Sequence, residues 1–396
     1  MKELSRVASA VRASTTLAVD ALAKQMRADG HDVIGFGAGE PDFDTPEYIK
    51  QAGIDAIVRG ETKYTPAAGL VPLRQAVANR LNRDYGLEYD SSCITIASGA
   101  KHNVFIALVS LLNPGDEVIL PAPYWVSYYE MILMAGGVPV VITAPESNGF
   151  RITTEQLEAA ITDKTKVFII NNPSNPSGML YSRADLEALM ALCVKNDLYI
   201  ISDEIYDGLV YDDKEFVSIP TLSDDIKERT ILINGVSKSY AMTGWRIGYS
   251  ASSKQLATVM ANYLSHSTGA PGTMNQIAAA EALNGPQDTI IAMRDVFSQR
   301  RDYIVERLNT IDGVSCIKPD GAFYIMMNIE KLLGRTLGDR VINSDDDFAL
   351  AFLDKGLVAV VPCSGFGTPN FVRWTYAASM ENIKAGLDRL EEFLKG

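Results

Sequence analysis

The chain has 396 residues, and 49 Asp and Glu against 36 Lys and Arg give a formal net charge of −13. A chain this acidic has no general electrostatic reason to bind nucleic acid or an anionic membrane surface. Its four cysteines and three histidines are dispersed, so neither a disulfide framework nor a metal site is predicted. Hydrophobic residues make up 47% of the chain, which indicates a globular protein. The length suggests two or three domains, or one large α/β domain with a smaller one.

The location expected from the sequence is the cytoplasm. Charged side chains interrupt the first 30 residues and leave no apolar core of a signal peptide. No apolar run approaches the roughly 20 residues that are needed to cross a bilayer. Dispersed cysteines are also typical of a reducing compartment.

Short apolar strands alternate with helices along most of the chain. An amphipathic helix over 14–29 precedes a strand at 32–36, and two helices follow at 46–58 and 70–84. Seven further strands are expected at 94–97, 117–120, 138–143, 167–171, 198–202, 230–234 and 246–250. The helices expected between them begin near residue 101 and cover 126–135, 154–161 and 182–196.

These seven strands are continuous apolar runs rather than alternating ones, which is typical of strands buried on both faces by helices. They predict an α/β fold with one large, mostly parallel, doubly wound sheet. A long helix over 286–311 follows, and the remainder, 315–396, is expected to form a smaller α+β region.

Polar residues follow these strands at their carboxyl ends, where sheets of this kind bind ligands. Gly99, Ala100 and Lys101 open a helix after the strand at 94–97. Such a turn suits a phosphate, although it is also an ordinary strand–helix turn. Asn175 lies in a loop fixed by two prolines and a glycine, where its amide either binds a ligand or bonds its own backbone.

The next two strand ends carry charged groups. Asp203 ends the strand at 198–202, with Tyr206 close by, so its carboxylate either faces a cation or caps a helix. Lys238 follows the strand at 230–234, with Arg246 eight residues on, and its alternative is an ordinary surface lysine. A phosphate turn, an amide, an acid with a phenol and a lysine together match pyridoxal 5′-phosphate, which needs a Schiff-base lysine and an acidic partner.

Seven ordered motifs carry a resemblance that covers essentially the whole chain. They are Ala38-Gly39-Glu40-Pro41-Asp42-Phe43, Lys63-Tyr64-Thr65-Pro66, Pro123-Tyr124-Trp125, Asn172-Pro173-Ser174-Asn175-Pro176-Ser177-Gly178, Asp203-Glu204-Ile205-Tyr206, Ser237-Lys238 with Arg246-Ile247-Gly248, and Phe371-Val372-Arg373. The chain resembles the fold-type I, class I aminotransferases, and most nearly the bacterial aspartate and aspartate/prephenate enzymes. The resemblance implies a pyridoxal-phosphate-dependent transferase fold with a large domain at 47–285 and a small one formed by 1–46 and 286–396.

The resemblance also implies roles for single residues. Lys238 forms the Schiff base and carries the substrate proton, Asp203 pairs with the ring nitrogen, and Tyr206 completes the catalytic set. Asn175 and Tyr206 bind the phenolic oxygen, and Trp125 stacks on the ring. The phosphate is surrounded by Gly99, Ala100, Lys101, Ser237 and Arg246, with Tyr64 reaching in from the neighbouring subunit of a homodimer.

The resemblance implies that Arg373, assisted by Gly39, binds the α-carboxylate of the substrate. Trp125 and Asn175 are also expected to contact the substrate. No arginine stands in 265–268 to hold a second carboxylate, so the expected distal contacts are Lys101, Arg12, Ser14 and Thr16. Ser14 can instead be a helix cap, and Arg12 a solvated charge. One departure from the family pattern is Gly235, which stands where some members have a serine on the phosphate.

The activity expected is transfer of the amino group of an acidic amino acid, with aspartate favoured, to 2-oxoglutarate by a ping-pong mechanism. Aromatic amino acids, prephenate or alanine are alternative substrates. A pyridoxal-phosphate-dependent β-lyase is a further alternative, because it shares the first chemical steps. No metal, nucleic acid or membrane partner is expected.

Overall fold

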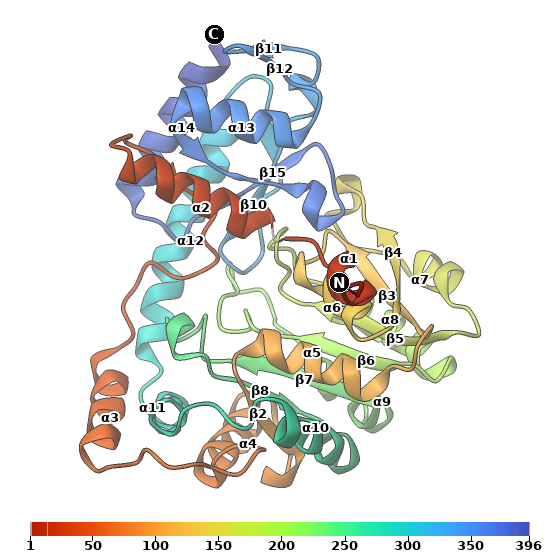
Figure 1. Cartoon of the computed structure of the whole chain (residues 1–396). Coiled ribbons are helices and arrows are strands. Elements are labelled where there is room, and N and C mark those ends of the chain that lie inside the picture. Colours follow the sequence, from red (N-terminus) through yellow and green to blue (C-terminus); the bar gives the residue numbers. More distant parts are fainter. Residues whose placement is uncertain (1, 14, 396) are drawn as a thin grey trace.

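The large sheet of the fold is built from strands whose side chains are mostly buried on both faces. The edge strand at Val138–Thr143 is the exception, since most of its side chains are exposed or half-buried. The computed structural model describes residues 2–13 and 15–395. The seven strands lie in the order β2-β8-β7-β6-β5-β3-β4, and β8 is antiparallel to both of its neighbours (Figure 1). They are β2 (Ile94–Ala97), β3 (Glu117–Ala122), β4 (Val138–Thr143), β5 (Thr165–Asn171), β6 (Tyr199–Asp203), β7 (Thr230–Gly235) and β8 (Gly248–Ala251). The predicted α/β class and the mostly parallel sheet are thus confirmed.

Helices cover both faces of this sheet, as the continuous apolar strands require. They are α3 (Glu47–Val58), α4 (Val71–Tyr85), α5 (Ala100–Leu111), α6 (Ser127–Met134), α7 (Thr154–Ala160), α8 (Arg183–Lys195), α9 (Asp224–Arg229), α10 (Lys254–Ser267) and α11 (Thr273–Asn284). Capping boxes start α7 at Thr153 and α8 at Ser182, which satisfies backbone N–H groups that a helix start leaves free. The sequence analysis did not predict α9, α10 or α11.

A second, four-stranded antiparallel sheet is formed by the C-terminal part of the chain, in the order β14-β15-β10-β9. Its strands are β9 (Ser315–Cys316), β10 (Tyr324–Asn328), β14 (Val361–Pro362) and β15 (Phe371–Thr375). This part also contains the helices α12 (Asp288–Leu308), α13 (Asp345–Gly356) and α14 (Met380–Lys395). Two short strands, β11 (Thr336–Leu337) and β12 (Arg340–Val341), pair with each other.

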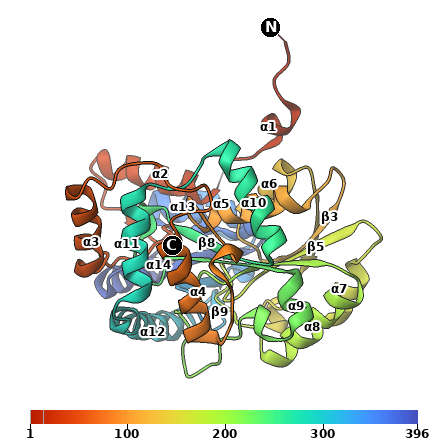
Figure 2. The same cartoon turned by 90° about the horizontal axis from the view of Figure 1, so that it is seen from below.

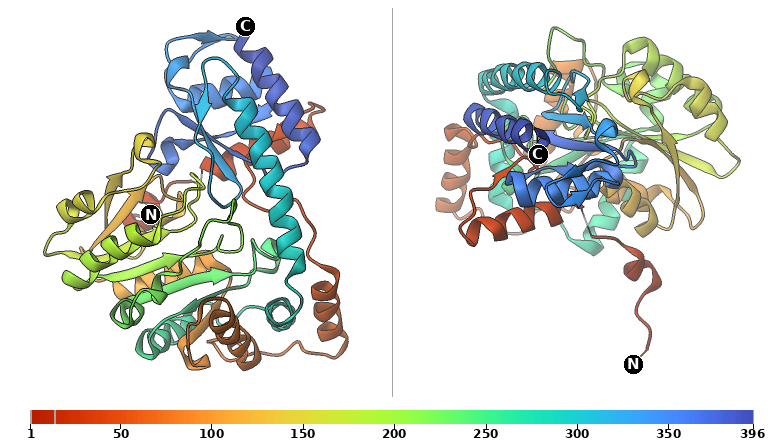
Figure 3. Two further views of the ribbon diagram at one scale, coloured as in Figure 1. Left: turned by 180° about the vertical axis from the view of Figure 1, so that it is seen from behind. Right: turned by 90° about the horizontal axis from the view of Figure 1, so that it is seen from above.

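The N-terminal segment packs against this C-terminal part. After α1 (Arg6–Ala10) and α2 (Thr15–Ala28), strand β1 (Ile34–Gly35) pairs in parallel with β13 (Val358–Ala359). Phe36 is fully buried and packs on Trp374, with ring centroids 4.7 Å apart. The chain before α1 extends away from the body (Figure 2). Because α12 runs past both sheets (Figure 3), the exact division at residues 46 and 286 stays a prediction.

The two sheets position the functional residues. The carboxyl ends of the parallel strands meet at one edge of the large sheet, and the second sheet lies opposite that edge (Figure 1). None of the helices in 2–13 and 15–395 is long and apolar enough to cross a membrane.

Candidate active site

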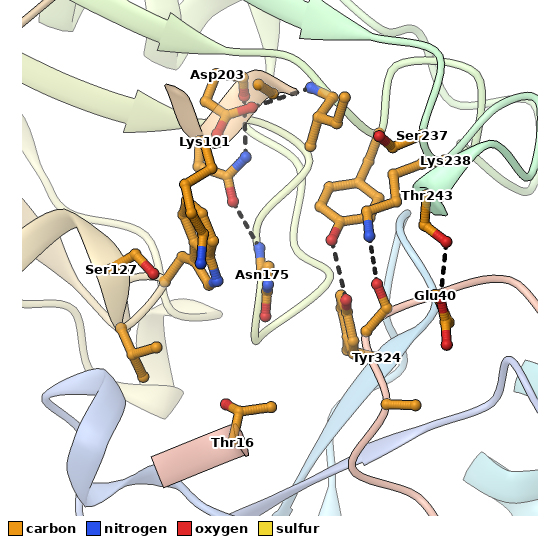
Figure 4. A pocket seen from close by; sticks show the side chains of 18 of the residues that line it. Thr16, Glu40, Lys101, Ser127, Asn175, Asp203, Ser237, Lys238, Thr243 and Tyr324 are labelled. Carbon is orange, nitrogen blue, oxygen red and sulfur yellow. Dashed lines mark hydrogen bonds between the residues drawn. The ribbon is translucent and has the colours of Figure 1, made fainter. Parts of the chain in front are cut away.

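A cleft of about 400 Å³ opens between the carboxyl edge of the large sheet and the segments packed against it. Twelve residues singled out in the sequence line it, although they are drawn from segments far apart in the chain (Figure 4). They are Thr16, Gly39, Ala100, Lys101, Trp125, Asn175, Asp203, Tyr206, Ser237, Lys238, Arg246 and Arg373. The structure therefore brings most of the expected site together, while the role of each residue stays a prediction.

The remaining residues of the expected site lie elsewhere. Gly99 is directly beside the Arg246 guanidinium, behind the cleft lining. Arg12 lines a neighbouring hollow of about 780 Å³ that shares Lys101 with the cleft. Tyr64 is fully exposed and does not line the cleft of its own chain. Ser14 lies outside the described residues.

Lys238 follows β7 and projects into the cleft. Its Nζ donates to the backbone carbonyl of Gly39, so the lysine joins the large sheet to the N-terminal loop. Burial of the amine lowers the pKa of Lys238 to about 8; Glu40 opposes this, and the charges of Arg373 and Arg246 add to it. A lysine with this pKa is about one-tenth neutral at pH 7, far more than an ordinary lysine, and the neutral form is the one that a nucleophile or base requires.

Asp203 is the last residue of β6 and is buried on the floor of the cleft. It accepts hydrogen bonds from the Tyr128 hydroxyl at 2.5 Å and from the Ile205 backbone N–H at 3.2 Å. Burial raises the pKa of Asp203 to about 6, although the bond from Tyr128 opposes the rise. The carboxylate thus needs a cationic partner to hold its charge fully at neutral pH.

Sequence reasoning missed Tyr128. It lies on α6, three residues after Trp125, and its ring meets the Trp125 ring edge-on at 5.3 Å. Trp125 precedes the helix, and the Tyr128 backbone N–H donates to the Trp125 carbonyl at 2.9 Å, so a single turn brings the two rings together. The spacing was the only available signal, since the bond to Asp203 spans 75 residues.

The end of the cleft near α5 is suited to an anion. The helix begins after Gly99, whose φ of +86° favours glycine, and a Cβ there would lie 2.4 Å from Arg246 Nη2. The backbone of Arg246 has a left-handed conformation, with a φ of +55°. Its guanidinium donates to the backbone carbonyls of Thr243 and Ser98. A helix N-terminus next to a fixed guanidinium and Ser237 attracts a phosphate or similar group.

Gly235 also has a steric reason to lack a side chain. A Cβ at this position would lie 2.9 Å from the Ile247 carbonyl oxygen and 3.1 Å from the Gly248 Cα. The close pairing of β7 with β8 therefore leaves no room there for the serine found in some relatives of this pattern.

Arg373 lies at the opposite side of the cleft, in the middle of β15. The side chain is buried, with 1% of its surface exposed, and it donates hydrogen bonds to Asn175 Oδ1 at 3.0 Å and to the Gly37 carbonyl at 2.8 Å. Its Nε has no hydrogen-bond partner among the described residues. The Tyr324 ring lies 4.4 Å from the guanidinium, and the Tyr324 hydroxyl is 3.0 Å from that of Tyr206. Tyr324 is a second lining residue that the sequence did not reveal.

The arrangement suits a particular class of ligand. An anion fits at the start of α5, and a cationic ring nitrogen fits opposite the buried Asp203. An aldehyde between these ends would lie where Lys238 projects. Arg373 offers a planar fork for a carboxylate that enters from the side of the second sheet. Among the described residues, no three His, Cys, Asp or Glu side chains are grouped so that they would hold a metal ion.

Replacement of the buried acid gives a test of these electrostatics. In the cofactor-free protein, the charged Asp203 destabilises the fold because its folded-state pKa lies above its unfolded value. This cost appears as the pH rises from 3.8 to about 6. Asp203→Asn should therefore stabilise the cofactor-free protein by about 1–3 kcal/mol at neutral pH and have little effect near pH 3.8. Urea unfolding across this range checks it, and a pH-independent difference would contradict it.

Comparison with known proteins gives one consistent result. The family described as "Aminotransferase class I and II" matches residues 31–390. The chain is 48% identical to an aspartate aminotransferase of Bacillus sp. (strain YM-2) over 397 residues, with full coverage of both proteins. It is 46% identical to an aspartate/prephenate aminotransferase of Cereibacter sphaeroides over 399 residues, again with full coverage of both.

A solved structure agrees with this result. The aspartate aminotransferase of Thermus thermophilus with maleate superimposes with a TM-score of 0.93 at 38% identity, covering 99% of this chain and 100% of that one. The resemblance seen in the sequence motifs and the fold-type I architecture are thus confirmed. The chain belongs to the class I and II aminotransferases.

Proposed function

We propose that the protein is a pyridoxal-phosphate-dependent aspartate aminotransferase that passes the amino group to 2-oxoglutarate in a ping-pong reaction. The observation that carries the proposal is the placement of Lys238. Its amine, with a pKa lowered to about 8, lies in one cleft with the buried Asp203 and the buried Arg373. Membership of the aminotransferase family supports the reaction class.

The residues of the large sheet hold the cofactor. Bound pyridoxal phosphate supplies an aldehyde for the substrate amine and a ring that accepts electrons when the α-proton leaves. Asp203 keeps the ring nitrogen protonated, and Tyr128 orients that carboxylate through its 2.5 Å hydrogen bond. Asn175 and Tyr206 bind the phenolic oxygen, and Trp125 covers one face of the ring. The phosphate is held by Gly99, Ala100, Ser237, Arg246 and the backbone N–H of Lys101 at the start of α5, which leaves the Lys101 amine for the substrate.

The substrate enters from the side of the second sheet. Arg373 binds its α-carboxylate as a fork, with the backbone at Gly39 alongside. This contact presents the α-proton to Lys238 Nζ. Lys238 then takes the proton as a general base and returns it as a general acid. The Gly39 carbonyl, which accepts from Lys238 Nζ here, would hold the amine in the cleft of the cofactor-free protein.

The preference for an acidic substrate rests on a second cationic site. Lys101 lines the cleft with its amine 4.9 Å from the Trp125 ring centroid, and Thr16 lies on α2 across from it. Arg12 contributes a further positive charge from the neighbouring hollow. Ser14 remains part of the proposed site on the basis of the sequence alone. The Thermus thermophilus relative was solved with maleate, a dicarboxylate, which supports the same class of substrate.

A bulkier acceptor is a second candidate. The neighbouring hollow is lined by the aromatic residues Phe105, Tyr124 and Tyr129 and shares Lys101 with the cleft. A ring-bearing keto acid such as prephenate would have both apolar contact and a cation there. The name of the Cereibacter sphaeroides relative includes prephenate.

We also propose that the protein is cytoplasmic and that it forms a homodimer in which each active site is built from both subunits. Tyr64 is a fully exposed aromatic residue, and Ile54, Ile57 and Val58 on α3 are exposed as well. Exposed apolar side chains of this kind are typical of an interaction surface. In the dimer, Tyr64 reaches the phosphate of the neighbouring site. Residues 1–46 with 286–396 would form the small domain of each subunit, and 47–285 the large domain.

Lys238 gives the first test of the reaction. Lys238→Ala removes the proton carrier, so sustained turnover of aspartate with 2-oxoglutarate should fall at least about a thousandfold. The absorbance of the lysine-bound cofactor should disappear as well. Lys254→Ala, at an exposed position on α10, is the matched control. Multiple turnovers by the Lys238 variant would overturn the mechanism.

Lys101 gives a test of the substrate class. Lys101→Met keeps the apolar stem but removes the distal cation, so KM for aspartate should rise about 10- to 100-fold. KM for alanine, which has no second carboxylate, should change little. Steady-state assays with both substrates measure the difference. Rapid conversion of alanine but not of aspartate by the unaltered enzyme would refute the preference for an acidic substrate.

A further inference from the structure

Among the buried carboxylates outside the cleft is Asp207, four residues after Asp203. The Asp207 side chain has no exposed surface. Its Oδ2 accepts from the Arg80 guanidinium, from the Tyr85 hydroxyl at 2.6 Å and from Asn234 Nδ2 at 2.7 Å. These three donors come from α4 and from β7, and none of them lines the cleft.

Arg80 keeps its positive charge despite its burial. Burial works against the charge of Arg80, but Asp207 and the nearby tyrosine hydroxyls hold its pKa above the ordinary value. Such a pair adds little net stability compared with apolar packing, because two charges lose their water. We therefore look for its role in positioning, because each donor fixes the orientation of the chain segment that carries it.

One arm of the cluster leads to both ends of the cleft. Asp207 is in the turn after β6, and its backbone N–H donates to the Glu204 carbonyl at 3.0 Å, which ties it to the segment carrying Asp203 and Tyr206. The Asn234 side chain, which donates to Asp207, accepts from the Gly235 N–H at 2.7 Å. Gly235 is three residues before Lys238. A single amide thus links the turn with Asp203 to the segment with Lys238.

The other arm leads toward the anion end. Arg80 also donates to the Tyr249 hydroxyl on β8. Tyr249 pairs with Asn234 across the β7–β8 ladder and is three residues after Arg246. The cluster therefore contacts each of the segments that carry Asp203, Lys238 and Arg246.

We propose that Asp207 is a positioning residue, which through Arg80, Tyr85 and Asn234 sets the spacing between Asp203, Lys238 and Arg246 and thereby the fit of the cofactor. This inference rests on the proposed function. A ligand that must meet all three groups at once depends on their separation, and a small misplacement of a reacting group is costly. The cluster acts through the backbone and touches neither cofactor nor substrate.

The test compares three variants by their affinity for pyridoxal phosphate. Asp207→Asn leaves the buried Arg80 with only the partly exposed Asp84 as a charged partner, so the double variant with Arg80→Met removes both charges and guards against simple misfolding. Tyr85→Phe removes a single donor at the edge of the cluster. Arg307→Lys is the control, because Arg307 joins Asp388 and Glu391 between α12 and α14, far from β6 and β7 in the chain.

The readouts are the dissociation constant of pyridoxal phosphate, the pH midpoint of the absorbance of the lysine-bound cofactor, and the thermal midpoint of the cofactor-free protein. The double variant should bind at least about tenfold more weakly and show a shifted pH midpoint. Tyr85→Phe should move both quantities in the same direction by a smaller amount, while Arg307→Lys should leave them unchanged.

Two other outcomes have distinct meanings. If Tyr85→Phe and the folded double variant keep the affinity and pH midpoint of the unaltered enzyme, the cluster is merely structural and the inference is overturned. If the unaltered enzyme itself binds no pyridoxal phosphate through Lys238, the proposed function fails, and the inference fails with it.

Discussion

Burial of opposite charges in one cleft is the constraint on which the site depends. The pKa of Asp203 is raised to about 6 and that of Lys238 is lowered to about 8, in both cases chiefly by burial. Burial therefore makes it harder for each group to hold its charge, and each gains from a partner that relieves this cost. A cationic ring nitrogen satisfies the first, and an aldehyde that consumes a neutral amine satisfies the second. The parallel strands end at one edge, which is why these groups meet at all.

The cleft also reverses the charge of the molecule around it. The protein carries a net charge of −13, yet Lys101, Lys238, Arg246 and Arg373 all line the same cleft. Long-range attraction of an anionic substrate is therefore weak, and binding must come from local, well-oriented contacts. Arg373 is an example, because its guanidinium is fixed by Asn175 and by the Gly37 carbonyl before any substrate arrives.

The sequence was a good guide wherever function lies at a strand end. Asp203, Asn175 and Lys238 could be identified because buried apolar strands are easy to recognise and the polar residue that follows them stands out. The helix α11 was missed because it buries small residues such as Ala278 and Ala279 against α3 and α4 and has no strong apolar stripe.

Partners distant in the chain could not be predicted. Tyr206 meets Tyr324 across 118 residues, and Asp207 meets Arg80 across 127. No local sequence pattern predicts either pair, because the two residues of each pair come together only in the folded chain. Asp207 in particular looks like an ordinary turn residue in the sequence, although its side chain is buried among three donors.

In the proposed mechanism, the amino group stays on the enzyme after the first half of the reaction. The most direct measurement mixes the cofactor-loaded enzyme with aspartate alone, without any keto acid. The proposed mechanism predicts one equivalent of oxaloacetate per chain, complete loss of the aldehyde absorbance and no free ammonia. Continued release of ammonia with fumarate, or an aldehyde absorbance that persists in saturating aspartate, would contradict it.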